Sequence, residues 1–152
     1  MASATIGETM EKVIREKQLT VVTRNVPGTL ARVTGVVAGR GVNIENVCAI
    51  AVGEEAILHL LTNNSEEARA ALEQDGYQVT ETEVILMQLW NRPGFLSAVA
   101  MQFRKHALNL QYVYGTSSPG GEKMTIVFSS DDNQAASEIF DAMVLEEAEQ
   151  TI

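Results

Sequence analysis

Two asparagines in this 152-residue sequence each open a short Pro-Gly phrase, and their types and spacing suit the binding of a small polar molecule. The phrase Asn-Val-Pro-Gly-Thr-Leu at residues 25–30 returns as Asn-Arg-Pro-Gly-Phe-Leu at residues 91–96. An asparagine amide both donates and accepts hydrogen bonds, and a glycine without a Cβ lets a ligand approach the backbone. Where such a turn opens a helix, the helix dipole alone favours an exposed anion by ~0.3–1 kcal/mol. The chemistry on offer is non-covalent capture of a small anion or zwitterion.

The phrase belongs to an internal repeat with an offset of 66 residues, since 91 − 25 = 66. The same offset maps residues 42–44, Val-Asn-Ile, onto residues 108–110, Leu-Asn-Leu. A repeat fixes the structural unit before its details are considered. We predict a first domain at 18–83, a second at 84–152 and an N-terminal extension at 1–17. A unit of this size buries only about 60% of its unfolded surface, so we expect the copies to pack on each other, on a second chain, or both.

Hydrophobic patterning predicts the order βαββαβ in the first domain. The predicted first helix turns Leu30, Val33 and Val37 inward, and the second, capped by Asn64 or Ser65, runs to Gln74. The four strands are predicted at residues 18–23, 42–52, 56–62 and 77–82.

The second domain repeats this order but lacks a convincing last strand. Strands are predicted at residues 84–90, 108–116 and 123–129. The helices are predicted to face inward with Leu96, Val99 and Phe103, and with Ala135, Ile139, Ala142 and Met143. Residues 146–152 are too acidic for the last strand, so this domain is truncated or another segment fills the position. Candidates are residues 1–17, which read as a short amphipathic helix or a frayed tail, and a symmetry-related chain.

These elements predict an α+β protein of two tandem ferredoxin-like βαββαβ units, with antiparallel sheets and helices on one face. The formal net charge of −9 argues against nucleic acid and against a polyanionic membrane surface. No apolar run approaches the roughly 20 residues of a membrane span, and no secretory signal is apparent, so we expect a cytoplasmic protein. A single cysteine, Cys48, excludes an intrachain disulfide framework.

Several families share the βαββαβ order, so the loops must discriminate between them. An RNA-recognition motif needs stacking aromatics on its third strand, and the two third strands offer only Phe128. A small metallochaperone of this fold needs a Cys-x-x-Cys loop, which is absent. An acylphosphatase-like enzyme needs an arginine in the first loop, and only the second copy, with Arg92, has one there.

The phrase Asn-x-Pro-Gly-x-Leu after the first strand, with Asn43 or Asn109 opening the second, resembles the ACT domain. The resemblance implies a regulatory module that binds a small molecule, most often an amino acid, at an interface between two units. It also implies a free-standing tandem protein without catalytic residues, metal or cofactor, forming a homodimer and acting on a possible partner enzyme. The ligand-binding residues that it implies are Asn25, Val26, Gly28, Leu30, Asn43, Ile44, Asn91, Arg92, Gly94, Phe95, Leu96 and Asn109.

Two alternatives stay open. In the first, the chain is a structural interaction module with no ligand. In the second and weaker one, it is an enzyme, although no nucleophile–base pair is visible in the sequence. The sequence also departs from some ACT ligand sites, because Thr23 and Leu89 stand where a histidine precedes the loop asparagine. That departure leaves the identity of the ligand open.

Overall fold

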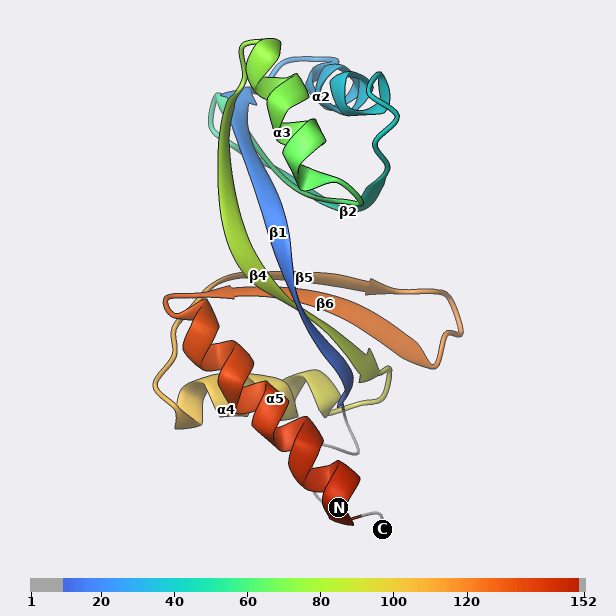
Figure 1. The fold of residues 1–152 in the computed structure, drawn as a ribbon, viewed down its shortest axis with the longest axis vertical. Helices are drawn as coiled ribbons and strands as arrows, with labels where there is room; N and C mark the ends of the chain where they lie inside the picture. Colours follow the sequence, from blue (N-terminus) through green and yellow to red (C-terminus); the bar gives the residue numbers. More distant parts are fainter. Residues whose placement is uncertain (1–9, 151–152) are drawn as a thin grey trace. The chain divides into compact units, whose positions relative to one another are not determined.

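The protein consists of two compact units that do not follow simple halves of the sequence. The computed structural model describes residues 10–150, with side chains from 12 to 144. The first unit is Lys17–Glu83, and the second combines residues 84–150 with residues 10–16. The elements, coloured along the chain in Figure 1, are β1 (Met10–Arg24), α2 (Thr29–Ala38), β2 (Ile44–Val52), β3 (Glu55–Thr62), α3 (Ser65–Gln74), β4 (Gln78–Trp90), α4 (Phe95–Lys105), β5 (Leu110–Ser117), β6 (Lys123–Ser130) and α5 (Asn133–Gln150).

The strands follow the hydrogen-bonded order β2-β3-β1-β4-β6-β5, and two long strands serve both units. Residues 17–24 of β1 and 78–83 of β4 belong to the first unit, whereas residues 10–16 and 84–90 belong to the second. Strands β2 and β3 pair antiparallel, as do β1 and β3, β4 and β6, and β5 and β6. The predicted α+β class with two ferredoxin-like βαββαβ units is confirmed.

The core of the first unit lies between its sheet and both of its helices. Alternate residues of β1 and β3 pack against buried residues of α2 and α3, so both helices cover the same face of the sheet (Figure 1). The buried residues of this core are Leu19, Val21, Val33, Val37, Val42, Ala56, Leu58, Leu60, Ala68 and Leu72.

The second unit has the same arrangement with larger side chains. Phe103 of α4 packs against Phe128 and Phe140, with ring centroids 5.2 Å apart in both pairs. The remaining core residues come from alternate positions of β4 and β6 and from both helices, namely Ile85, Met87, Leu89, Val99, Ile126 and Ala136. Val13 of β1 also packs on this core. The N-terminal half of β1 therefore belongs beside β4, where a last strand is required.

The prediction of an amphipathic helix within residues 1–17 is wrong for the part that the structure describes. Residues 10–17 are extended in β1, and the predicted helix cap at Thr5–Glu8 lies outside the described residues. The helical spacing of Met10, Val13 and Ile14 was a weak signal because the segment is short. Pairing with β4 outweighs such a local preference for helix, because without a neighbouring strand the backbone groups along that edge of β4 would be unsatisfied.

Three predicted inward positions are also wrong. Leu30 and Leu96 are 50% and 43% exposed, because each lies in the first turn of its helix beyond the edge of the core. On α5, Phe140 is buried whereas Ala142 is exposed, so the inward face is rotated from the predicted one.

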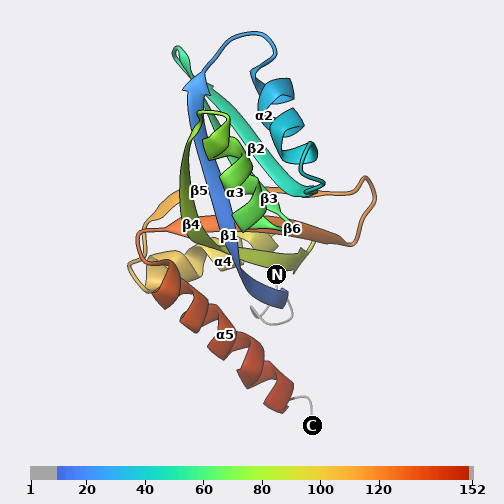
Figure 2. The same ribbon diagram turned by 45° about the horizontal axis from the view of Figure 1, so that its top comes forward.

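Strand pairing fixes which residues of the two units correspond. Val22 pairs with Ile57, which pairs with Ile50, and in the second unit the matching row is Gln88, Thr125 and Thr116. The offset is thus 66 residues on β1/β4 and β2/β5, but 68 on β3/β6. The two additional residues lie in the β5–β6 turn, which is the longer of the two hairpin turns (Figure 2).

A substitution in β1 tests the assignment of residues 10–16 to the second unit. We expect Val13→Asp to lower the free energy of unfolding by about 1–3 kcal/mol, because it places a charge against an apolar core. The exposed neighbour Lys12 points to the other side of the strand, and Lys12→Asp is expected to cost less than about 0.5 kcal/mol. Urea unfolding measures both. Equal effects of the two variants would contradict the assignment.

Candidate functional site

Both repeated phrases form a turn that requires glycine. Gly28 and Gly94 are the N-caps of α2 and α4, with φ of 86° and 91°, a left-handed conformation that other residues rarely adopt. Neither cap makes a side-chain hydrogen bond to its helix. Each phrase thus connects a strand to a helix whose first turn lacks a side-chain cap.

Hydrogen bonds hold the first turn in place. The Thr29 hydroxyl lies 2.8 Å from both the Arg24 and the Val26 carbonyl oxygens, to which it can donate. The Asn25 backbone N–H donates to the Glu54 carbonyl at 2.8 Å, which joins the end of β1 to the β2–β3 turn. The turn is therefore organised by Thr29 and the backbone, without help from the Asn25 side chain.

A hollow of about 310 Å³ lies beside this turn in the first unit. Four of the predicted site residues line it, and a cross-strand pair of small residues, Ala51 and Ala56, makes room in it. The lining consists of Asn25, Val26, Gly28, Thr29, Leu30, Ala49, Ile50, Ala51, Ala56 and Leu58. None of these lining residues is charged, and the Arg32 guanidinium lies beside the turn, with Nη2 3.4 Å from Thr29 Oγ1. The hollow therefore suits an apolar group that carries a polar or anionic end.

Unused hydrogen-bonding groups lie at the turn. Within residues 12–144, the Asn25 amide has no hydrogen-bond partner, and the backbone N–H groups of Leu30 and Ala31 have no acceptor. These two N–H groups lie in the first turn of α2, where the dipole favours an anion. Polar groups suited to a carboxylate and an amine thus lie next to an apolar hollow.

The corresponding turn of the second unit uses its asparagine internally. The Asn91 amide donates to Gly121 O at 3.1 Å and lies 3.3 Å from Ser117 Oγ, both at the β5–β6 turn. Phe95 stands where the first unit has Thr29 and is only 7% exposed. The longer β5–β6 turn therefore supplies the partner that Asn25 lacks.

Arg92 of the second turn lies over an aromatic ring. Its guanidinium carbon is 5.7 Å from the Trp90 ring centroid, and Lys123 Nζ is 5.2 Å from the same centroid. Such cation–π contacts contribute about 0.5–1 kcal/mol at exposed sites. Trp90 is thus engaged with cations of its own unit.

The second-strand asparagines lie at the far end of their helices. Asn43 N donates to Asn63 Oδ1 and Asn109 N to Asp131 Oδ1, both at 3.0 Å. Ile44 packs against the core of the first unit. Because α2 has 10 residues and a helix rises about 1.5 Å per residue, Asn25 and Asn43 lie roughly 15 Å apart along it. One unit cannot present both side chains to one small ligand.

Sequence reasoning missed the floor of the hollow. Alanine is not a residue type that suggests a binding site, so Ala49, Ala51 and Ala56 were not predicted. Small residues at alternate strand positions beside large β-branched ones were nevertheless a usable signal. Thr29 was also missed, because its role depends on carbonyl positions that only the folded turn defines.

One titratable group is buried in the sheet of the first unit. Gln18 Nε2 and Thr20 Oγ1 lie 3.1 Å and 3.0 Å from His59 Nδ1. An amide NH₂ can only donate, so His59 Nδ1 accepts from Gln18 and the ring is neutral. Burial lowers the pKa of His59 below its usual 6.5, because it penalises the charged form.

Among the described residues, no group of three or more His, Cys, Asp or Glu side chains is placed to hold a metal ion. No helix in the described part of the chain is long and apolar enough to cross a membrane.

A family model matches the first unit. Residues 19–76 match the AHAS small subunit-like ACT domain. They include the turn, both helices and three strands of the first unit. Residues 19–76 therefore form an ACT domain. No curated protein matches the chain.

Solved structures share the whole architecture. Protein BT0572 from Bacteroides thetaiotaomicron superposes with a TM-score of 0.76 at 23% identity, covering 93% of this chain and 91% of that one. The regulatory subunit of aspartate kinase from Thermus thermophilus gives 0.62 at 14% identity, with 90% and 97% covered. The corresponding subunit from Thermus flavus gives 0.61 at 14%, with 89% and 98% covered. At these identities the likeness shows the fold.

The lowered pKa of His59 predicts acid sensitivity. Between the folded-state pKa and the unfolded value of about 6.5, the unfolded chain binds more protons, so stability falls as pH falls through this window. We expect His59→Gln to remove part of the decrease in the free energy of unfolding between pH 7 and pH 5. Urea unfolding at stepped pH measures it, with His106→Gln as the control at an exposed histidine. A decrease that survives His59→Gln unchanged would exclude this source.

The two loop asparagines predict different effects on stability. Asn91→Ala removes two hydrogen bonds to the β5–β6 turn and is expected to lower the free energy of unfolding by about 0.5–1.5 kcal/mol. Asn25→Ala removes none within the described residues and is expected to stay within about 0.5 kcal/mol of the parent. Urea unfolding of both variants gives the comparison, and equal losses would contradict the difference between the turns.

Proposed function

We propose that this protein is a non-catalytic regulator whose first unit, residues 18–83, binds an amino acid with a small apolar side chain. The observation that carries the proposal is that the Asn25 amide and the backbone N–H groups of Leu30 and Ala31, which have no partner among residues 12–144, lie beside an apolar hollow of about 310 Å³. Carboxylates and amines need such polar partners, and an apolar side chain gains about 25 cal/mol for each Å² removed from water.

Each part of the ligand has a proposed contact. The carboxylate accepts from the N–H groups of Leu30 and Ala31, and the amine or carboxylate meets the Asn25 amide. The side chain lies against Ala49 and Ala51. A basic side chain would lose its hydration without gaining an ion-pair partner, because no acidic residue lines the hollow.

We further propose that a second chain completes the site. Asn43 lies at the opposite end of α2 from Asn25, so a ligand contacted by both kinds of asparagine needs Asn43 or Asn109 from another unit, which in this proposal belongs to a second copy. A ligand that binds only the assembled arrangement stabilises it, and a partner enzyme then responds to that population. In the second unit, the turn at Asn91, Arg92, Gly94, Phe95 and Leu96 serves structure rather than ligand capture.

Thermal unfolding in the presence of each of the twenty amino acids at millimolar concentration tests the proposal. A ligand at about 100 times its Kd adds roughly 2.7 kcal/mol to stability. We expect small aliphatic amino acids to raise the midpoint and basic ones to leave it unchanged. Asn25→Ala and Ala51→Phe should abolish the shift, the second by filling the hollow.

Two controls make the result specific. Val52→Phe alters an exposed neighbour on the other face of β2, and Asn91→Ala alters the second turn, so both should keep the shift. The midpoint of each variant without ligand reports whether it folds. If no amino acid shifts the parent protein, the ligand-free structural module is favoured instead.

A further inference from the structure

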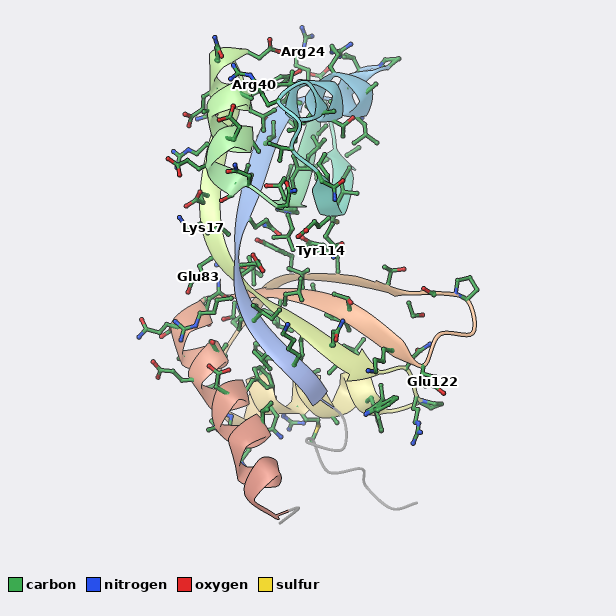
Figure 3. All side chains as sticks on the ribbon, turned by 45° about the vertical axis from the view of Figure 1, so that its right-hand side comes forward. Lys17, Arg24, Arg40, Glu83, Tyr114 and Glu122 are labelled. Atoms are coloured by element: carbon green, nitrogen blue, oxygen red, sulfur yellow. The ribbon has the colours of Figure 1, made fainter. Side chains whose placement is uncertain are left out.

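The helices of the first unit are joined at one end by an arginine. Arg40, just beyond α2, forms an ion pair with Glu67 of α3 at 3.0 Å and a hydrogen bond with Gln74 of the same helix. Figure 3 shows Arg40 beside both helices. These side chains fill the space between the end of α2 and α3.

The second unit lacks all three members of this contact. By the offsets of 66 and 68 residues, Arg40 corresponds to His106, Glu67 to Ala135 and Gln74 to Ala142. The helix caps confirm the alignment, because Asn64 Oδ1 accepts from Glu67 N at 3.1 Å and Asp132 Oδ1 from Ala135 N at 2.9 Å. His106 Nδ1 donates instead to Gln102 O of its own helix at 3.0 Å.

A groove of about 520 Å³ lies between α4 and α5 where the first unit has that contact. Its floor is an apolar stripe of α5 at helical spacing, made of Ala135, Ile139, Ala142 and Met143. The space is large enough for several side chains, since ligand pockets commonly measure about 300–1,000 Å³. Two alanines in the stripe permit a second helix to approach closely.

The rims of this groove carry opposite charges. Lys105 lies on the α4 side, beside His106, and Glu138 lies on the α5 side. Among residues 12–144, Lys105 has no ion-pair partner, and Glu138 accepts only from Gln134 on its own helix at 3.1 Å. Neither charge is therefore neutralised within the described part of its own unit.

We propose that the α4–α5 groove is a self-association surface that binds the same groove of a second copy of this chain. In a two-fold interface, residue i contacts residue j and residue j contacts residue i. A groove with one positive and one negative rim is complementary to itself under that symmetry, so each Lys105 meets the partner's Glu138. The apolar stripes of the two α5 helices then cover each other.

This surface is independent of the ligand site, since it uses no residue of the first unit. The net charge of −9 opposes close association of two copies in general, so a specific contact needs local attraction of this kind. Two Lys105–Glu138 pairs across the axis supply it. The charge-reversal variants therefore separate this inference from amino-acid binding, because they leave every residue of the ligand site unchanged.

Charge reversal in the full-length chain tests the proposal by sedimentation velocity over a range of protein concentrations. We expect the parent to show a monomer–dimer equilibrium, and Lys105→Glu or Glu138→Lys to raise the dimer Kd by about tenfold or more, because each places like charges together. The double variant restores opposite charges across the axis and should return the Kd to within about threefold of the parent.

Arg69→Glu and Glu73→Lys are the matched controls, because they reverse an exposed ion pair on α3, outside the groove, and should leave the Kd unchanged. Urea unfolding of each variant reports whether it folds. The proposal is overturned if the parent stays monomeric, if the single reversals leave the dimer intact, or if the double variant is weaker than both singles.

Discussion

A left-handed glycine at the strand-to-helix junction is the constraint on which the functional part of this fold depends. It lets the chain turn from β1 into α2, and from β4 into α4, within a few residues. The same turn leaves the first helical N–H groups without a side-chain cap. A glycine that the backbone conformation requires thus also creates a place where an anion is favoured. Any other residue at Gly28 would be strained whatever space surrounds it.

The two copies keep this backbone and diverge in what surrounds it. In the first unit, small residues on β2 and β3 open a hollow and Asn25 is unpartnered within the described residues. In the second, a longer hairpin turn receives the Asn91 amide and a phenylalanine fills the place of Thr29. The reverse holds at the other end of the helices. There Arg40 bridges α2 and α3 in the first unit, whereas alanines leave a groove between α4 and α5 in the second. The two units thus share a backbone arrangement, but the open space lies at opposite ends of their helices.

The sequence predicted the order of helices and strands better than it predicted the hollow and the groove between them. The repeat of Asn25 at Asn91 and of Asn43 at Asn109 defined the two copies. The order of helices and strands within each copy was predictable because turn glycines and hydrophobic periodicity are local signals. Residues 10–16 were misread, because their helical spacing is local whereas the place they fill beside β4 is not. The exposure of Leu30 and Leu96 was missed for a similar reason, since periodicity cannot locate the edge of a core. The hollow depends on which alanines meet across two strands, and that requires the register.

The two long strands, β1 and β4, decide where this protein can be divided. β1 runs unbroken from Met10 to Arg24, and β4 from Gln78 to Trp90, so each passes through the boundary between units as regular strand. The second unit takes a strand from the opposite end of the chain. A gene fragment that encodes one repeat would therefore not encode one unit, and transplanting the second copy into another protein would leave a sheet edge behind. The sequence repeat follows halves of the chain, whereas the folded units do not.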